Sequence, residues 1–263
     1  MHFTVETWDE FKEQWGGVIN FLMDGEMAAF RFDLPPLADA LDQLRRSPNT
    51  RIYKGEKSPS FIHEDISEDF RALPIEEALE SPFNIANFEL DEFYGPGRLF
   101  HRLEESWVEP WRRSLEQNGF TYRECFPIVF VSGRNCATNY HLDYSHVMAW
   151  QRYGTKLFYG LKDPDRWTTP EQRLRCELNM TKPTEIIEDD ILCYEMPPGS
   201  VLWNAISTPH WVDAADEVAL TMSMVHRGLR LNGKLCPHEE DNRILSKKLE
   251  EESKELSSVK KEI

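Results

Sequence analysis

The sequence predicts a mainly β protein with flanking helices (α+β), whose centre is an antiparallel barrel or jelly roll. Three features indicate this fold class: short segments rich in β-branched and aromatic residues, glycine and proline turns between them, and amphipathic helical stripes in the N-terminal part. We therefore expect a helical N-terminal portion packed on the barrel (1–120), a β core (121–237) and a charged C-terminal helix or tail (238–263).

The N-terminal portion contains three helical patterns. Thr7 and Glu10 have the spacing of a capping box, and the apolar side chains that follow share one helical face: Trp8, Phe11 and Trp15. A leucine stripe after two prolines indicates a second helix, at Leu37, Leu41 and Leu44. The third covers 97–117, where Pro110 should kink the helix and Asn118-Gly119 should end it. Between the last two helices, residues 51–53 suggest a strand.

The β core is predicted from segments in which apolar, β-branched and aromatic residues dominate: 126–131, 147–150, 156–159, 200–203 and 218–225. Gly154 allows a turn before the third segment, and Pro197-Pro198-Gly199 makes a turn before the fourth. Many short strands separated by such turns are typical of barrels and jelly rolls.

Composition limits the classes of partner. The chain has 263 residues, of which 40% are hydrophobic and 12% aromatic, enough for one sizeable core. A formal net charge of −16 argues against nucleic acid as a partner, because binding the phosphate backbone needs clustered lysine and arginine. The same charge tolerates a basic protein or a cationic metabolite and does not choose between them.

Cysteine usage and the absence of membrane-length apolar runs point to the cytoplasm. The cysteines are odd in number and show no C-x-x-C spacing, so we expect free thiols: Cys125, Cys136, Cys176, Cys193 and Cys236. No stretch reaches the roughly 18 to 20 apolar residues of a membrane span, and the first residues lack the blocks of a secretory signal.

The candidate metal ligands are His141, Asp143 and His210. On a strand, residues i and i+2 point to the same face, so His141 and Asp143 can offer an imidazole and a carboxylate to one ion. His210 follows a later strand candidate and can complete the set. Two histidines and one carboxylate leave coordination positions open, which suits non-haem Fe(II) that activates O2.

The ordered motifs resemble the JmjC and cupin-like Fe(II)- and 2-oxoglutarate-dependent oxygenases, and in spacing the small asparaginyl-hydroxylase type. The resemblance covers about 100 residues and runs through Thr138-Asn139-Tyr140-His141-Leu142-Asp143, Gly154-Thr155-Lys156, Pro198-Gly199-Ser200-Val201-Leu202-Trp203 and Pro209-His210-Trp211-Val212. It implies a double-stranded β-helix, Fe(II) as metal, 2-oxoglutarate as cosubstrate and O2 as oxidant. It also implies hydroxylation of a C–H bond, in a small polar metabolite or a protein side chain, coupled to formation of succinate and CO2.

The resemblance assigns the cosubstrate to three further residues. Thr138 and Lys156 match the threonine and lysine that hold the distal carboxylate, and Ser223 falls about where relatives carry a small polar residue. A buried carboxylate needs a paired charge, which Lys156 would supply. Val147 departs from the pattern, because many relatives have an asparagine there. His146, Trp203 and Trp211 are candidate neighbours of the pocket, His146 as a core or supporting residue.

Two other classes stay open. A cupin-type dioxygenase or isomerase would use the same three ligands without 2-oxoglutarate, although Thr138 and Lys156 argue against it. A binding or sensor protein could retain the barrel without turnover. For the tail, dimerisation through a C-terminal helix and a solvated, frayed end are both open.

Overall fold

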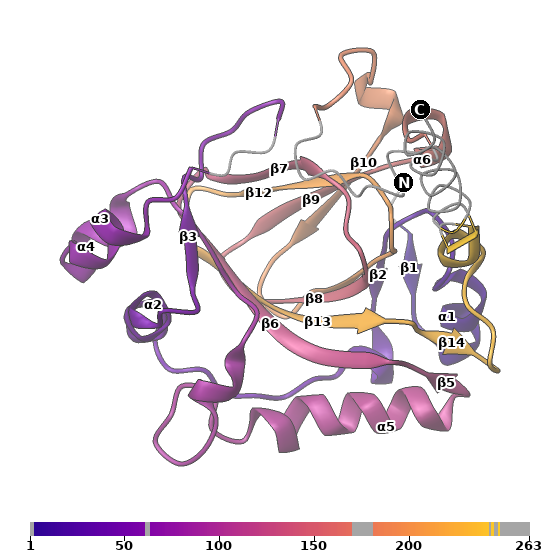
Figure 1. Cartoon of the computed structure of the whole chain (residues 1–263), viewed down its shortest axis with the longest axis horizontal. Helices are drawn as coiled ribbons and strands as arrows, with labels where there is room; N and C mark the ends of the chain where they lie inside the picture. Colours follow the sequence, from indigo (N-terminus) through magenta and orange to yellow (C-terminus); the bar gives the residue numbers. More distant parts are fainter. Residues whose placement is uncertain (1–2, 61–63, 170–180, 242, 245–246, 248–263) are drawn as a thin grey trace, which may run out of the picture.

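The computed structural model describes residues 3–60, 64–169, 181–241, 243–244 and 247. Two β-sheets face each other, with α5 beneath the larger one (Figure 1). The described strands of the larger sheet lie in the order β1-β2-β11-β8-β13-β6-β4-β3, and those of the smaller sheet in the order β10-β9-β12-β7. A two-stranded ribbon joins β14 and β5. The mainly β architecture with flanking helices is therefore confirmed.

The strands of the predicted core are divided between the two sheets, and every consecutive pair except β9 and β10 changes sheet. The larger sheet takes β6 (Glu124–Ser132), β8 (His146–Tyr153), β11 (Val201–Asn204) and β13 (Ala219–Arg227). The smaller sheet consists of β7 (Ala137–His141), β9 (Lys156–Leu161), β10 (Ile191–Met196) and β12 (His210–Ala214). All pairings among these strands are antiparallel.

The N-terminal portion contributes short strands in addition to the helices that the sequence indicates. The strands β1 (Thr4–Val5) and β2 (Phe21–Met23) extend one edge of the larger sheet, and β3 (Arg51–Tyr53) and β4 (Asn84–Asn87) extend the other. Only β3 was expected, because the other segments are short and lack the alternating pattern that identifies a strand. They are strands because they pair with strands distant in sequence. The proposed division at residue 120 remains a prediction.

The predicted helices are present, but the third is shorter than expected, because residues 97–102 form turns and bends instead of helix. Thr7 caps α1 (Trp8–Gln14) with the reciprocal bonds of a capping box, and α2 (Leu37–Arg46) follows the two prolines. The third begins with a π-helical turn at Glu104–Val108 and continues as α5 (Glu109–Gln117). Proline lacks a backbone N–H, so the irregular turn falls where Pro110 interrupts the helical hydrogen bonds.

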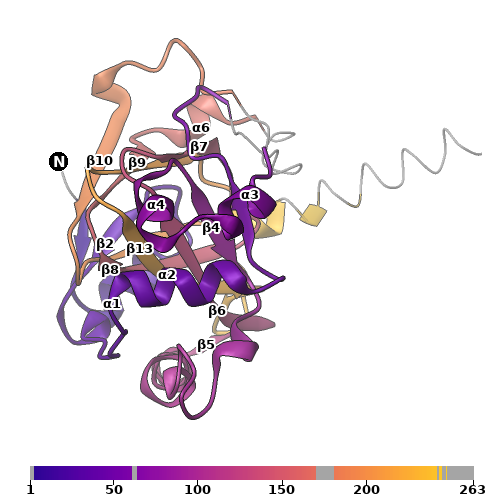
Figure 2. The same cartoon turned by 90° about the vertical axis from the view of Figure 1, so that its left-hand side faces the viewer.

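Short elements complete the fold. The helices α3 (Ser67–Ala72) and α4 (Ile75–Glu80) lie with α2 on the side of the molecule that faces the viewer in Figure 2. The remaining elements are α6 (Pro164–Trp167), β5 (Phe120–Thr121), β14 (Arg230–Leu231) and the 3-10 turns Gly25–Ala28, Leu90–Phe93 and Glu188–Asp190. No helix in the described ranges is both long and apolar enough to cross a bilayer.

Two hydrophobic layers flank the larger sheet. The outer layer joins its far face to the helices and includes Phe11, Trp107, Trp111 and Trp203. The inner layer, between the sheets, includes Ala149, Phe158, Tyr194 and Leu202. Because both faces are covered, β13 is buried from Ala219 to His226, and only its last residue, Arg227, is exposed. The sequence of the strand is accordingly rich in apolar residues.

The tail and one cysteine lie largely outside the described residues. Residues 237–241 are helical, but residues 248–263, on which much of the dimer prediction rests, are not described. Cys125, Cys136, Cys193 and Cys236 are free thiols, as expected, whereas Cys176 falls in the undescribed segment 170–180.

Candidate metal centre

The two histidines of the predicted triad meet through strand pairing. His141 ends β7, His210 begins β12, and the two residues are direct partners in the antiparallel register. Residues opposite each other in such a pair point to the same face, so both imidazoles enter the space between the sheets. Asp143 lies two residues beyond the end of β7, not on the strand as expected. The loop is anchored by a hydrogen bond from Ser207 N–H to the Asp143 carbonyl, at 3.0 Å.

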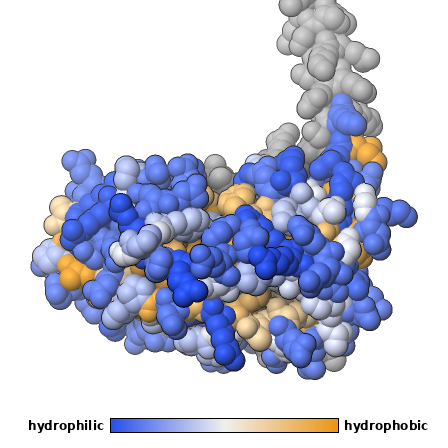
Figure 3. All heavy atoms as spheres, turned by 90° about the horizontal axis from the view of Figure 1, so that it is seen from below, coloured by the Kyte–Doolittle hydropathy of each residue, from blue (hydrophilic) through white to orange (hydrophobic). Residues whose placement is uncertain are grey.

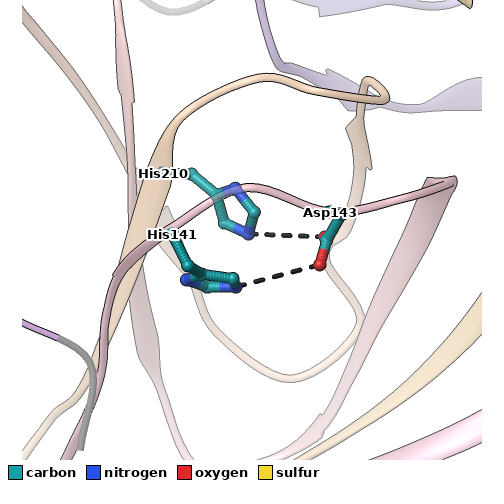
Figure 4. A group of neighbouring side chains, drawn as sticks. All are labelled: His141, Asp143 and His210. Atoms are coloured by element: carbon teal, nitrogen blue, oxygen red, sulfur yellow. Dashed lines mark ion pairs between the residues drawn. The ribbon is translucent and has the colours of Figure 1, made fainter. Parts of the chain in front are cut away.

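The three ligand atoms converge. Asp143 Oδ2 lies 3.5 Å from His210 Nε2, and Asp143 Oδ1 lies 3.9 Å from His141 Nε2, as the dashed lines in Figure 4 show. One nitrogen or oxygen from each residue falls within 4.8 Å of the others, close enough for one ion to contact all three. His141 and His210 are 8% and 3% exposed, so the carboxylate is the most accessible member.

Hydrogen bonds to backbone carbonyls fix the orientation of both imidazoles. His141 Nδ1 lies 2.7 Å from the Asn139 carbonyl, and His210 Nδ1 lies 2.9 Å from the Thr208 carbonyl. A carbonyl only accepts, so each Nδ1 carries the proton and each Nε2 presents a lone pair toward Asp143. Backbone carbonyls that fix the tautomer in this way are typical of metal-binding histidines.

Burial also keeps His141 neutral. Desolvation, with a smaller contribution from neighbouring His210, lowers the pKa of His141 to about 4, against the opposing effect of Asp143. A neutral imidazole is the form that binds a metal ion, so near neutral pH His141 does not have to lose a proton first.

Asn204 supports the triad and was not anticipated. It ends β11, and its side-chain Nδ2 donates to Asp143 Oδ2 at 2.7 Å and lies 3.4 Å from His210 Nε2. The sequence contained a weak signal: Asn204 is a polar residue two positions after Leu202, on the inward face of a buried strand. Asn204 is also the register partner of Val147, so an asparagine lies across from the position where relatives carry one.

A register shift brings Thr138 to the same face as His141. The two are three residues apart on β7, which on a regular strand would place them on opposite faces. However, Thr138 pairs with Val212 and His141 pairs with His210, so β7 uses three steps where β12 uses two. This bulge returns Thr138 to the inward face.

Lys156 and Ser223 also face the space between the sheets. Phe158, two residues after Lys156 on β9, stacks on the His210 ring at 5.1 Å with an interplanar angle of 7°. Lys156 shares that face. Ser223 pairs directly with Ala149, a member of the inner layer, and is therefore inward as well.

Lys156 is a buried cation without a counter-charge in the described part of the chain. It is 5% exposed, and neither a hydrogen bond nor an ion pair joins its ammonium to another described residue. Desolvation lowers the pKa of Lys156 to about 7. Burying an unpaired ammonium is unfavourable, so this position favours an anionic ligand.

The other suggested pocket neighbours face away from the triad. Trp203 donates its indole N–H to the Trp15 carbonyl at 3.0 Å in the outer layer, and Trp211 stacks on Tyr159. Each lies one residue from an inward side chain, Leu202 or His210, and so points to the opposite face.

His146 is a core residue, as the sequence suggested. Its Nε2 lies 3.6 Å from Cys236 Sγ, with the Glu239 carboxylate nearby. However, its Nδ1 accepts a hydrogen bond from Ile206 N–H at 3.2 Å, so in the neutral ring Nε2 carries the proton. The nitrogen that faces Cys236 and Glu239 therefore has no lone pair for a metal ion, and the lone pair of the other nitrogen is already used by Ile206.

Comparisons with known proteins establish the fold. No family model matches the chain, and no curated protein matches it in sequence. Among solved structures, the X-ray structure of YcfD from Escherichia coli matches with a TM-score of 0.54 and 18% identity, over 84% of this chain and 53% of that one. YcfD, described as a ribosomal oxygenase, also matches in complex with cobalt and 2-oxoglutarate, with a TM-score of 0.54 and 17% identity over 86% of this chain and 52% of that one. Its complex with cobalt and succinic acid gives a TM-score of 0.55 and 16% identity over the same shares.

The chain thus spans about half the length of the structures it matches. At 16–18% sequence identity, the similarity to these structures shows a shared fold and not a shared activity. The resemblance to 2-oxoglutarate oxygenases drawn from the sequence motifs is confirmed at that level: over most of its length, this chain has the fold of the Escherichia coli ribosomal oxygenase YcfD.

Proposed function

We propose that this protein is an Fe(II)- and 2-oxoglutarate-dependent dioxygenase that hydroxylates a C–H bond and converts 2-oxoglutarate and O2 into succinate and CO2. The observation that carries the proposal is the convergence of two Nε2 lone pairs and one carboxylate in an inter-sheet space that also contains a buried, unpaired lysine. YcfD, which shares the fold, was solved with cobalt and 2-oxoglutarate and with cobalt and succinic acid, which supports the same ligands here.

The donor set fits Fe(II). His141, Asp143 and His210 would hold the ion as a two-histidine, one-carboxylate set that leaves positions free for cosubstrate and O2. When bound, iron would activate O2, which is the oxidant: 2-oxoglutarate would supply two of the four electrons that O2 accepts, and the C–H bond the other two. The protein's part is to fix the ligands: two backbone carbonyls hold the imidazoles, and Asn204 holds the carboxylate.

The inward face also suits the cosubstrate. Lys156 would pair with the distal carboxylate of 2-oxoglutarate, and the hydroxyls of Thr138 and Ser223 would add neutral hydrogen bonds. Binding the dianion would compensate the desolvation of the ammonium, which the protein alone leaves unbalanced. A cupin-type enzyme without 2-oxoglutarate would have no need for this buried cation.

We further propose that β6 to β13 form a double-stranded β-helix. Apart from β9 and β10, consecutive strands pass from one facing sheet to the other, and the proposed ligands lie at the end of β7, in the following loop and at the start of β12. The similarity to a ribosomal oxygenase favours a protein side chain over a small metabolite as the substrate. The asparaginyl-hydroxylase resemblance remains a prediction.

The test is succinate formation from 2-oxoglutarate by the purified full chain with Fe(II), ascorbate and O2, with and without cell extract. Wild-type protein should form succinate, and extract containing the substrate should stimulate it. Asp143→Ala should abolish turnover because it removes the anionic ligand. Asp213→Ala is the matched control, since Asp213 lies on β12 but pairs with exposed Lys57 at 2.8 Å.

A second readout does not depend on turnover. Co(II) added to the protein should produce a saturable visible absorbance that the Asp143→Ala variant loses and the Asp213→Ala variant retains. Succinate formation that survives Asp143→Ala would contradict the ligand assignment. Metal binding without succinate formation would favour the enzyme class that does not use 2-oxoglutarate.

A further inference from the structure

A hollow with walls rich in arginine opens on the molecule away from the candidate metal centre. Arg31 comes from the segment before α2, Arg98 and Arg102 from the turn before α5, and Arg152 from the end of β8. We call this hollow the arginine groove; its volume is about 850 Å³. The charge of its walls reverses that of the whole protein, in which 46 acidic residues outnumber 30 basic ones.

The groove is separate from the proposed catalytic site. Arg152 lies six residues along β8 from His146, at the end of the strand away from the Asp143 loop. At ~3.3 Å per residue, this places the groove ~20 Å from the first residue of β8. A ligand in the groove would therefore not contact the three proposed metal ligands.

Most of the guanidinium groups in the groove form no ion pair with another described residue, although Asp33 lies near enough to Arg152 to favour its charge. Among the described residues, Arg31, Arg98 and Arg152 form no ion pair, whereas Arg102 pairs with Glu105 at 3.2 Å. The acidic residue in the wall is Asp33. Four cations held around one hollow repel one another, so an anion that bridges them would stabilise the arrangement.

Contacts with Trp150 and Phe32 hold the guanidinium of Arg152 in place in the wall of the groove. Its guanidinium carbon lies over the Trp150 ring, 4.0 Å from the centroid, and the group donates to the Phe32 carbonyl. Arginine has five N–H donors, and one is used in this bond to Phe32, which leaves others for a ligand. A half-buried guanidinium held by an aromatic face is pre-organised for binding a planar or tetrahedral anion.

We propose that the arginine groove binds a small molecule that carries a chain of phosphate groups, such as a nucleoside triphosphate or free polyphosphate. The guanidinium fork matches phosphate oxygens in bidentate geometry. Four arginines against one aspartate suit a ligand with several negative charges. The volume lies in the range of small-ligand sites, which favours a compact anion over an extended acidic chain.

The surroundings agree with a polar ligand. Figure 3 views the molecule from the side of α5, and most of that surface is hydrophilic, with small hydrophobic areas. The aromatic rings nearest the groove are engaged elsewhere: Phe30 packs against Trp107, Trp111 and Trp150. Recognition would therefore rest on the phosphate chain more than on stacking of a base.

The experiment is calorimetric titration of the full chain with sodium tripolyphosphate, and in parallel with a nucleoside triphosphate. The test variant is Arg31→Gln/Arg98→Gln, which removes two exposed groove cations. The matched control is Arg46→Gln/Arg134→Gln, two exposed arginines that pair with Asp42 and Glu80 outside the groove. Each pair lowers the formal net charge by two from −16, so long-range repulsion changes equally.

We expect saturable one-site binding to wild type and control, and a Kd at least tenfold higher for the groove variant, since charge-assisted hydrogen bonds are lost. Comparable affinity for both titrants would identify the phosphate chain as the recognised part, and tighter nucleotide binding would identify the nucleotide as the source. Equal weakening in both variants, or no saturable binding to wild type, would overturn the proposal. Tighter binding of a polyglutamate peptide would overturn the choice of a phosphate ligand. None of these readouts depends on oxygenase activity.

Discussion

Lys156→Met should stabilise the protein while weakening its hold on 2-oxoglutarate. The side chain is buried between the sheets and has no ion-pair partner among the described residues. Keeping it charged therefore lowers the free energy of unfolding. Methionine has a similar length without the charge and can fill the same space. A gain in stability from removing a site residue would indicate that Lys156 is present for a ligand.

The magnitude follows from the pKa of Lys156. Burial lowers it from 10.5 to about 7. With ~1.4 kcal/mol for each tenfold change in proton affinity, the charged form costs on the order of 5 kcal/mol in folding stability below pH 7. Between about pH 7 and 10.5 the unfolded state binds more protons than the folded state, so wild-type stability rises with pH. At pH 9 the remaining cost is ~2 kcal/mol.

Urea unfolding at pH 6 and pH 9, without metal or 2-oxoglutarate, tests this reasoning. Lys156→Met should raise the free energy of unfolding at pH 6, by at least ~2 kcal/mol once context dependence is allowed for, and by clearly less at pH 9. Lys162→Met, on the exposed surface just after β9, is the matched control and should show little effect. A destabilised Lys156→Met protein, or a gain independent of pH, would show that the ammonium is compensated in the folded state.

Three other outcomes follow from the contacts. Asn204→Leu should weaken Co(II) binding by about 10- to 100-fold through loss of the 2.7 Å hydrogen bond to Asp143. An unchanged Co(II) titration would show that Asn204 does not support metal binding. The Kd for 2-oxoglutarate should rise as the pH increases from 7 to 9, because Lys156 loses its proton, and Lys156→Arg should flatten this dependence; parallel profiles would place the dicarboxylate elsewhere. Thr7→Ala should reduce the free energy of unfolding by about 1 kcal/mol, since the capping box of α1 is lost, whereas Glu13→Ala should not; equal midpoints would mean that the cap adds nothing.

Local sequence patterns predicted many of the helices and strands. The capping box at Thr7, the leucine stripe of α2 and the apolar runs of β6, β8 and β13 depend on neighbours within a few residues, so they could be identified from the chain alone. The triad was also accessible, because its residue types and order are set by the chemistry of a metal ion. The roles of these residues remain predictions.

Long-range pairing decided what local patterns could not. The strands β1, β2 and β4 are recognisable only through their partners in the larger sheet. The register shift between β7 and β12 turned Thr138 inward, against the face that simple alternation assigns to it. Asp143 proved to lie in a loop, held to a position that no strand periodicity describes.

The sequence by itself determined the class of fold, most of the core strands and the three side chains that meet at the candidate metal centre. Only the tertiary structure decided the tautomers of His141 and His210, the bond from Asn204 to a carboxylate 61 residues away, and the isolation of Lys156. The physical reason is that secondary structure follows short periodicities. The protonation, desolvation and orientation of a side chain depend instead on which distant atoms surround it after folding.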